Sequence, residues 1–202
     1  RIAKALKVSN PNYIVSLVGS YVQALPIKTL EDEQEIDIGF TNEGVYAIWN
    51  ILKMPEITLS ELKNLKGIVY RYNGTIYLNK TEDVVPTERM DLDLPGYAWD
   101  LLPYKEVPLD MYRAPLWHAE YDEEKRSPYA AIQSSLGCNF GCAFCMINII
   151  NRNDEEPIGV ASNYSRMRFW SPEFMIKQFD ILANMGIRTI RIVDEMFLLN
   201  RK

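Results

Sequence analysis

The sequence predicts an α/β protein that contains two parallel β-α-β arrangements, with a β-hairpin between them. Short apolar runs, typical of buried strands, occur at residues 13–18, 36–40 and 130–135. Segments with apolar residues at helical spacing follow the later two runs. Because strand and helix alternate, we expect parallel strands, and the ligands of such sheets bind beyond the carboxyl ends of the strands.

The first β-α-β arrangement occupies the N-terminal region. The strand YIVSLV ends at Gly19 and Ser20, which predict a tight turn, and Pro26 marks a helix start in LPIKTLEDEQ. The strand IDIGF follows, and Thr41 is expected to cap the next helix. The apolar positions of that helix recur at helical spacing: Val45, Ile48, Trp49 and Leu52.

A β-hairpin and a long connecting segment come next. The stretch GIVYRYNGTIYLN contains Asn73 and Gly74, a pair that favours the two-residue turn of a hairpin. Residues 80–128 contain many prolines and acidic groups and include the aromatic stretch PGYAWDLLPY. We expect this segment to be an ordered linker packed on another part of the chain.

The second β-α-β arrangement begins near Tyr129. A strand is expected at AAIQSS, residues 130–135, and a cysteine-containing loop follows it directly. Ser171 and Pro172 form a helix start and Gly186 a helix end. The strand TIRIV then ends at Asp194 and Glu195, so we expect both acids and the cysteine loop at the carboxyl ends of their strands. The predicted helix has its apolar face at Met175, Phe179, Leu182 and Met185.

Composition and charge argue against several classes of protein. The 202 residues are 48% apolar and 11% aromatic, which is enough for folded cores. A net charge of −5 gives no basic field for nucleic acid or an anionic membrane, and no apolar run approaches the roughly 20 residues of a membrane span. We expect a cytoplasmic protein with no nucleic-acid partner and no membrane span. The start at Arg1, in the helix-like RIAKALK, also predicts a fragment of a longer protein.

All three cysteines lie within eight residues, at Cys138, Cys142 and Cys145. Their odd number and tight spacing, C-x3-C-x2-C, argue against a disulfide framework and favour metal ligands in a reducing compartment. A structural zinc site needs four ligands, but the sequence offers only one histidine, His118, which lies upstream. Thiolates also bind iron-sulfur clusters, and three thiolates leave one iron of a four-iron cluster open. Glycines at positions 137 and 141 permit the tight backbone path.

The cysteine loop, with Phe144 just before the last cysteine, resembles the signature of radical S-adenosylmethionine enzymes. The resemblance implies that the three cysteines bind a 4Fe-4S cluster and that Phe144 belongs to the S-adenosylmethionine site. It also implies that residues 129–202 form the first part of a partial (β/α) TIM-type barrel. Asp194 and Glu195 then stand where the family receives the methionine amino group, although this chain has VDEMF rather than a Gly-Gly-Glu run. The implied reaction is reductive cleavage of S-adenosylmethionine to methionine and a 5′-deoxyadenosyl radical.

The N-terminal region resembles the last third of a cobalamin-binding, Rossmann-like (flavodoxin-like) domain that precedes the radical domain in one subgroup. The similarity lies in VGSYVQALP and FTNEG, with Ser20 in place of a glycine. It implies cobalamin contacts at Gly19, Ser20, Glu43 and Gly44. The implied organisation is the cobalamin-binding part at residues 1–66, a linker with a β-hairpin at 67–128 and the radical domain at 129–202.

The resemblance implies an enzyme that acts on an unactivated carbon of a small-molecule or lipid-like substrate, and with cobalamin transfers a methyl group to it. It also implies an electron donor such as flavodoxin or ferredoxin. Three alternatives stay open: a radical rearrangement or cyclisation without methyl transfer, a non-catalytic zinc-binding module, and a cobalamin or nucleotide carrier domain without chemistry of its own.

Overall fold

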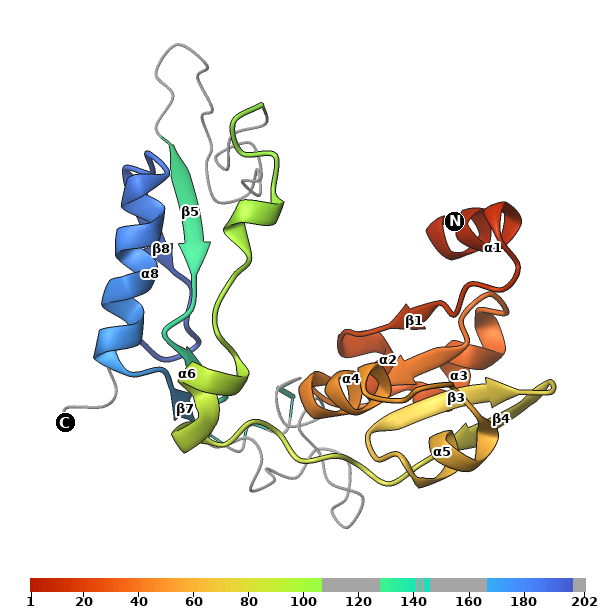
Figure 1. Cartoon of the computed structure of the whole chain (residues 1–202). Helices are drawn as coiled ribbons and strands as arrows, with labels where there is room; N and C mark the ends of the chain where they lie inside the picture. Colours follow the sequence, from red (N-terminus) through yellow and green to blue (C-terminus); the bar gives the residue numbers. More distant parts are fainter. Residues whose placement is uncertain (107–127, 141, 143, 146–166, 198–202) are drawn as a thin grey trace. The chain divides into compact units, whose positions relative to one another are not determined.

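A computed structural model describes residues 1–106, 128–140, 142, 144–145 and 167–197 (Figure 1). His118 and Gly141 lie outside these ranges. The chain forms two compact units: residues 1–85 with 137–166, and residues 86–136 with 167–202. Each unit contains one parallel pair of strands, so the predicted mixed α/β class is confirmed.

The sheet of the first unit has the strand order β1-β2-β3-β4. Strand β1 (Ser16–Leu17) pairs in parallel with β2 (Ile38–Phe40), and helices α2 (Ser20–Ala24) and α3 (Pro26–Asp32) connect them. Helix α1 (Ile2–Ser9) precedes the sheet. The strand expected at 13–18 is shorter than predicted and is not buried, because β1 lies at the edge of the sheet and has one neighbour. Tyr13 and Val18 lie outside β1 and are half exposed.

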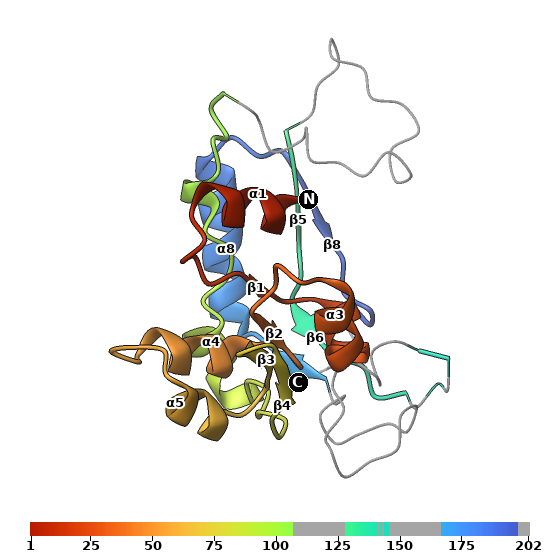
Figure 2. The same ribbon diagram turned by 90° about the vertical axis from the view of Figure 1, so that its right-hand side faces the viewer.

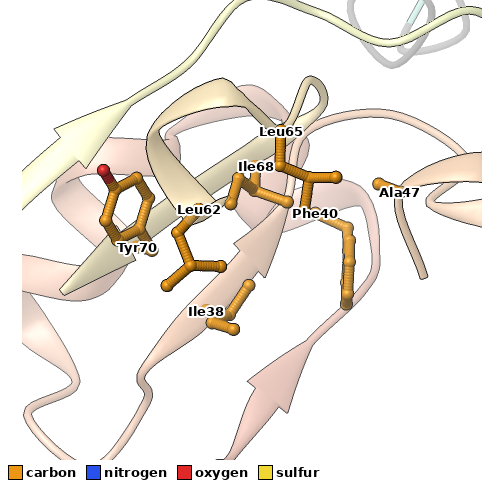
Figure 3. Packing of buried hydrophobic residues seen from close by; sticks show 7 residues of the cluster. All are labelled: Ile38, Phe40, Ala47, Leu62, Leu65, Ile68 and Tyr70. Carbon is orange, nitrogen blue, oxygen red and sulfur yellow. The ribbon is translucent and has the colours of Figure 1, made fainter. Parts of the chain in front are cut away.

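Strand β2 is buried along its whole length and forms the centre of a hydrophobic core. Helix α4 (Val45–Leu52) and helix α5 (Leu59–Asn64) contribute to this core. Figure 3 shows its buried members, which are Ile38, Phe40, Ala47, Leu62, Leu65, Ile68 and Tyr70. Gly39 fits between the side chains of Val22 and Val69, where a Cβ atom would lie within 3 Å of both.

The expected capping of α4 by Thr41 is wrong. The helix begins after Gly44, which has φ +78°, and no side chain caps it. Thr41 instead donates its backbone N–H to the carbonyl of Gly67 at 2.9 Å. The side chain of Asn42 accepts a hydrogen bond from Gly44 N at 3.1 Å, so an Asx-type turn separates β2 from α4.

The predicted hairpin is confirmed. Strands β3 (Ile68–Tyr72) and β4 (Thr75–Leu78) are joined at Asn73 and Gly74, which have φ angles of +47° and +80°. Strand β3 also pairs antiparallel with β2, with Ile38 opposite Tyr70. The hairpin therefore completes the sheet of the first unit, and the N-terminal part of that unit extends to Val85.

The second unit places helix α8 (Pro172–Asn184) beside the parallel strands β5 (Tyr129–Ile132) and β8 (Thr189–Ile192), as Figures 1 and 2 show. Ser171 caps α8 by accepting a hydrogen bond from Phe174 N at 3.1 Å, as the sequence predicts. A short antiparallel pair, β6 (Ser135–Leu136) with β7 (Arg168–Phe169), follows β5. The strand predicted at 130–135 is thus divided into two pieces that pair with different partners.

The segment 86–106 belongs to the second unit and is bonded to residues at the start of α8. It contains a short helix α6 (Met90–Asp93) and two 3₁₀ turns, η1 (Thr87–Arg89) and η2 (Trp99–Leu101). Leu94 O accepts a hydrogen bond from Trp170 Nε1 at 2.8 Å, and Asp91 Oδ1 accepts one from Ser171 N. The core of this unit consists of Trp99, Ala130, Ile132, Met175 and Leu182. Within the described ranges, no helix combines the length and the apolar character of a membrane span.

Helix α8 offers a test of this core. Leu182 is fully buried, whereas Ile176 on the same helix is 58% exposed. We expect Leu182→Ala to lower the free energy of unfolding by about 2–5 kcal/mol, because the change leaves a cavity. Ile176→Ala should change it by no more than about 0.5 kcal/mol. Denaturant unfolding followed by tryptophan fluorescence measures both, and equal losses would contradict the packing described.

Candidate functional site

The cysteine loop follows β6 directly. Cys138 and Cys145 are partly buried, Cys142 is exposed, and none of the three is in a disulfide bond. Cys145 N donates to Cys142 O at 2.9 Å, so these two cysteines flank a single turn. The backbone N–H of Phe140 points at Cys138 Sγ, with an N to S distance of 3.5 Å.

The donor set suits a thiophilic metal or an iron-sulfur cluster. Three thiols lie on a short loop that begins at Gly137, whose φ of +86° is a backbone conformation that glycine adopts at no steric cost. Phe144 is 92% exposed and contributes to no described core. In the described part of the chain, no three Cys, His, Asp or Glu side chains already converge on one point that could hold a metal. The fit therefore rests on the chemistry of the donors and on their spacing.

The two acids predicted after β8 have different surroundings. Asp194 is partly buried, and its Oδ1 accepts a hydrogen bond from Ser134 N at 2.7 Å. Its Oδ2 accepts one from the Ser134 hydroxyl at 2.5 Å. Glu195 is exposed. The parallel pairing of β5 and β8 thus brings Asp194 to the end of β5, as the sequence predicts, and Ser134 is a partner that the sequence analysis did not identify.

Tyr97 is a second residue that the sequence analysis did not single out. Its ring packs against Trp99 with the ring centroids 4.8 Å apart. Burial raises the pKa of the Tyr97 phenol above its usual value, and the nearby charge of Asp194 adds to the rise, whereas a hydrogen bond with the backbone of Gln133 lowers it. The phenol therefore lies at the same corner of the second unit as Asp194 and stays protonated near neutral pH. The only signal in the sequence was the aromatic stretch PGYAWDLLPY.

In the first unit, the predicted residues lie in the turns that follow β1 and β2, at the carboxyl ends of these parallel strands. Gly19 has φ +139°, with nothing within 4 Å of the position that a Cβ atom would take, and Ser20 begins α2. Gln23 of α2 donates its side-chain amide to the backbone carbonyl of Asn42. This bond connects the Gly19 turn to the turn that contains Gly44.

Glu43 has a structural partner as well. Its carboxylate accepts a hydrogen bond from the backbone N–H of Val85 at 3.1 Å, and the side-chain amide of Asn42 donates to the carbonyl of Glu82. Asn42 is 1% exposed and Val85 is fully buried. Asn42 and Glu43 thus attach the segment 82–85 to the turn after β2. Sequence reasoning missed Asn42, although Asn two residues before Gly is a common turn signal.

Comparison with known proteins gives one informative relative. The chain is 28% identical over 205 aligned residues to a protein of Pyrococcus horikoshii named as an uncharacterized methyltransferase. The alignment covers 100% of this chain and 37% of that relative, so the chain spans little more than a third of the relative's length. No protein-family model matches the chain. The chain is therefore similar, along its whole length, to part of a protein named for methyl transfer.

The role of Glu43 can be tested by two substitutions. Glu43→Ala leaves the buried N–H of Val85 without this acceptor and should lower the free energy of unfolding by about 1–3 kcal/mol. Glu43→Gln keeps an acceptor oxygen and should cost less than half as much. Glu56→Ala, at an exposed position of the same unit, is the control and should be neutral. Urea unfolding measures all three, and a Glu43→Ala variant as stable as the control would contradict the anchoring role.

Proposed function

We propose that the chain is part of a radical S-adenosylmethionine enzyme that transfers a methyl group to an unactivated carbon. The observation on which the proposal depends is the cysteine loop: every cysteine of the chain lies within eight residues, directly after a strand. The similarity over the full chain to a protein named as a methyltransferase supports the methyl-transfer part.

Cys138, Cys142 and Cys145 would hold a 4Fe-4S cluster. The exposure of Cys142 and Phe144 supports a loop that meets a ligand rather than one that fills a core. When bound, a cluster with one open iron would supply the electron that cleaves S-adenosylmethionine to methionine and a 5′-deoxyadenosyl radical. The electron would come from a donor such as flavodoxin or ferredoxin.

The remaining residues of the proposed site would bind and orient S-adenosylmethionine. Glu195 is exposed just beyond β8, and its carboxylate suits the positively charged methionine amino group. Phe144 offers an exposed aromatic face for an adenine or a sulfonium group. The substrate class is a small or lipid-like molecule, and the enzyme would work in the cytoplasm.

The first unit would bind cobalamin at the carboxyl ends of β1 and β2. The open space beside Gly19 supports this assignment, because a ligand can approach the backbone there without meeting a side chain. Ser20 offers a hydroxyl at the start of α2, whereas Gly44 is buried and, with φ +78°, shapes the turn into α4. Glu43 would act through the backbone it holds rather than by direct contact. When bound, methylcobalamin would supply the methyl group.

Metal analysis tests the cluster. After anaerobic reconstitution with iron and sulfide, we expect about four irons and about four sulfides per chain. The triple variant Cys138→Ala, Cys142→Ala, Cys145→Ala should bind neither, because all the thiolate donors are gone. The circular dichroism of the triple variant should match that of the unreconstituted wild type, which shows that it folds. The control Ile176→Ala keeps all three cysteines and should bind as much iron and sulfide as the wild type. A triple variant with wild-type iron and sulfide would contradict the proposal, and a colourless wild-type protein with one zinc would favour the zinc-binding module.

Corrin binding tests the first unit separately. Hydroxocobalamin should bind equally well to the wild type and to the triple alanine variant, because its proposed site contains no cysteine. Ser20→Tyr should weaken binding about tenfold by filling the space at the start of α2. Lys4→Tyr adds the same bulk at an exposed position of α1 and should have no effect. Equilibrium dialysis gives the affinities, and no binding by the wild type would exclude cobalamin from this unit.

A further inference from the structure

The chain changes its strand partner between β5 and β6. Ile132, at the end of β5, accepts a hydrogen bond from Val193 N at 2.9 Å and so belongs to the parallel pair with β8. Ser135, at the start of β6, pairs instead with Phe169 of β7. At such a change of partner, backbone N–H groups lose the acceptors of a regular ladder and need others. Ser134 lies at this corner.

Asp194 supplies the acceptors. Its Oδ1 is 2.7 Å from Ser134 N and 3.4 Å from Ser135 N, and its Oδ2 accepts from the Ser134 hydroxyl. Hydrogen bonds from neutral donors to a carboxylate are stronger than those between neutral groups. One side chain therefore joins the end of β8 to the corner that ends β5, across 60 positions of the sequence.

The corner is followed almost at once by the cysteine loop. Ser135 is 2% exposed, and Arg168, the strand partner of Leu136, is 6% exposed, so both strands of the β6–β7 pair contain a buried polar residue. Leu136 then leads to Gly137 and Cys138. Only Leu136 and Gly137 separate the Ser134–Ser135 corner from Cys138 in the sequence.

We propose that Asp194 is a positioning residue whose carboxylate fixes the Ser134–Ser135 corner and thereby the first cluster ligand, Cys138. This inference rests on the proposed function. It gives the two neighbouring acids different tasks: both oxygens of Asp194 are already engaged by protein donors, and exposed Glu195 is the acid left for a ligand. Side chains that orient metal ligands from outside typically change metal affinity 10–100-fold when removed.

The test compares four variants in the whole chain. Asp194→Ala removes all three acceptor contacts. Asp194→Asn keeps an oxygen that can accept from Ser134 N, so it should hold the corner nearly as well as the wild type. Glu195→Ala alters the neighbouring acid, and Leu182→Ala lowers the stability of the same unit without touching the corner. Two quantities are measured: hydrogen exchange of residues 133–136 in the metal-free protein, and the rate at which a chelator removes iron from the reconstituted protein.

Asp194→Ala should speed exchange at Ser134 and Ser135 and should speed iron loss about tenfold or more. Asp194→Asn should restore most of the wild-type behaviour, and Glu195→Ala and Leu182→Ala should lose iron at the wild-type rate. Iron loss from Asp194→Ala at the wild-type rate would overturn the inference, as would equal acceleration in Leu182→Ala. If the wild type bound no cluster, the proposed function would fail. Unchanged hydrogen exchange in metal-free Asp194→Ala would separately show that Asp194 does not hold the Ser134–Ser135 corner.

Discussion

Parallel pairing of two strands that a helical connection separates along the chain is the constraint on which both units depend. It brings the residues that follow the two strands to the same edge of a sheet. In the first unit this edge joins the Gly19 turn to the Asn42 turn through Gln23. In the second unit it joins Ser134 to Asp194. In each unit, a polar contact between distant parts of the sequence therefore connects the segments that follow the two strands.

Features governed by local chemistry could be predicted from the sequence. The Asn73–Gly74 turn follows from the tolerance of these residues for positive φ, and the start of α8 follows from Ser171 and Pro172. Features that depend on which segments pack or pair together in the folded chain could not be predicted. The exposure of β1 is set by its place at the sheet edge, and the strand expected at 130–135 divides because β7 supplies a second partner. Thr41 fails as a cap because Asn42 delays the helix to Val45.

Some residues of the candidate sites could likewise be predicted from the sequence, and others could not. The cysteine loop is visible in the sequence because spacing alone defines a thiolate donor set. The tasks of Glu43 and Asp194 are not visible, because their partners, Val85 and Ser134, lie 42 and 60 positions away. In both cases a carboxylate that could have met a ligand instead holds backbone beside a proposed site. We therefore propose that the exposed groups bind ligands and that the partly buried carboxylates position the backbone.

In the proposed function, three thiolates hold a cluster whose remaining iron is open to S-adenosylmethionine. Electron paramagnetic resonance of the reconstituted and chemically reduced protein, recorded with and without S-adenosylmethionine, tests it most directly. We expect the signal of a reduced four-iron cluster whose shape changes when S-adenosylmethionine is added, because the ligand binds the open iron. A cluster signal that is identical in both samples, or no cluster signal from a protein that contains zinc, would contradict it.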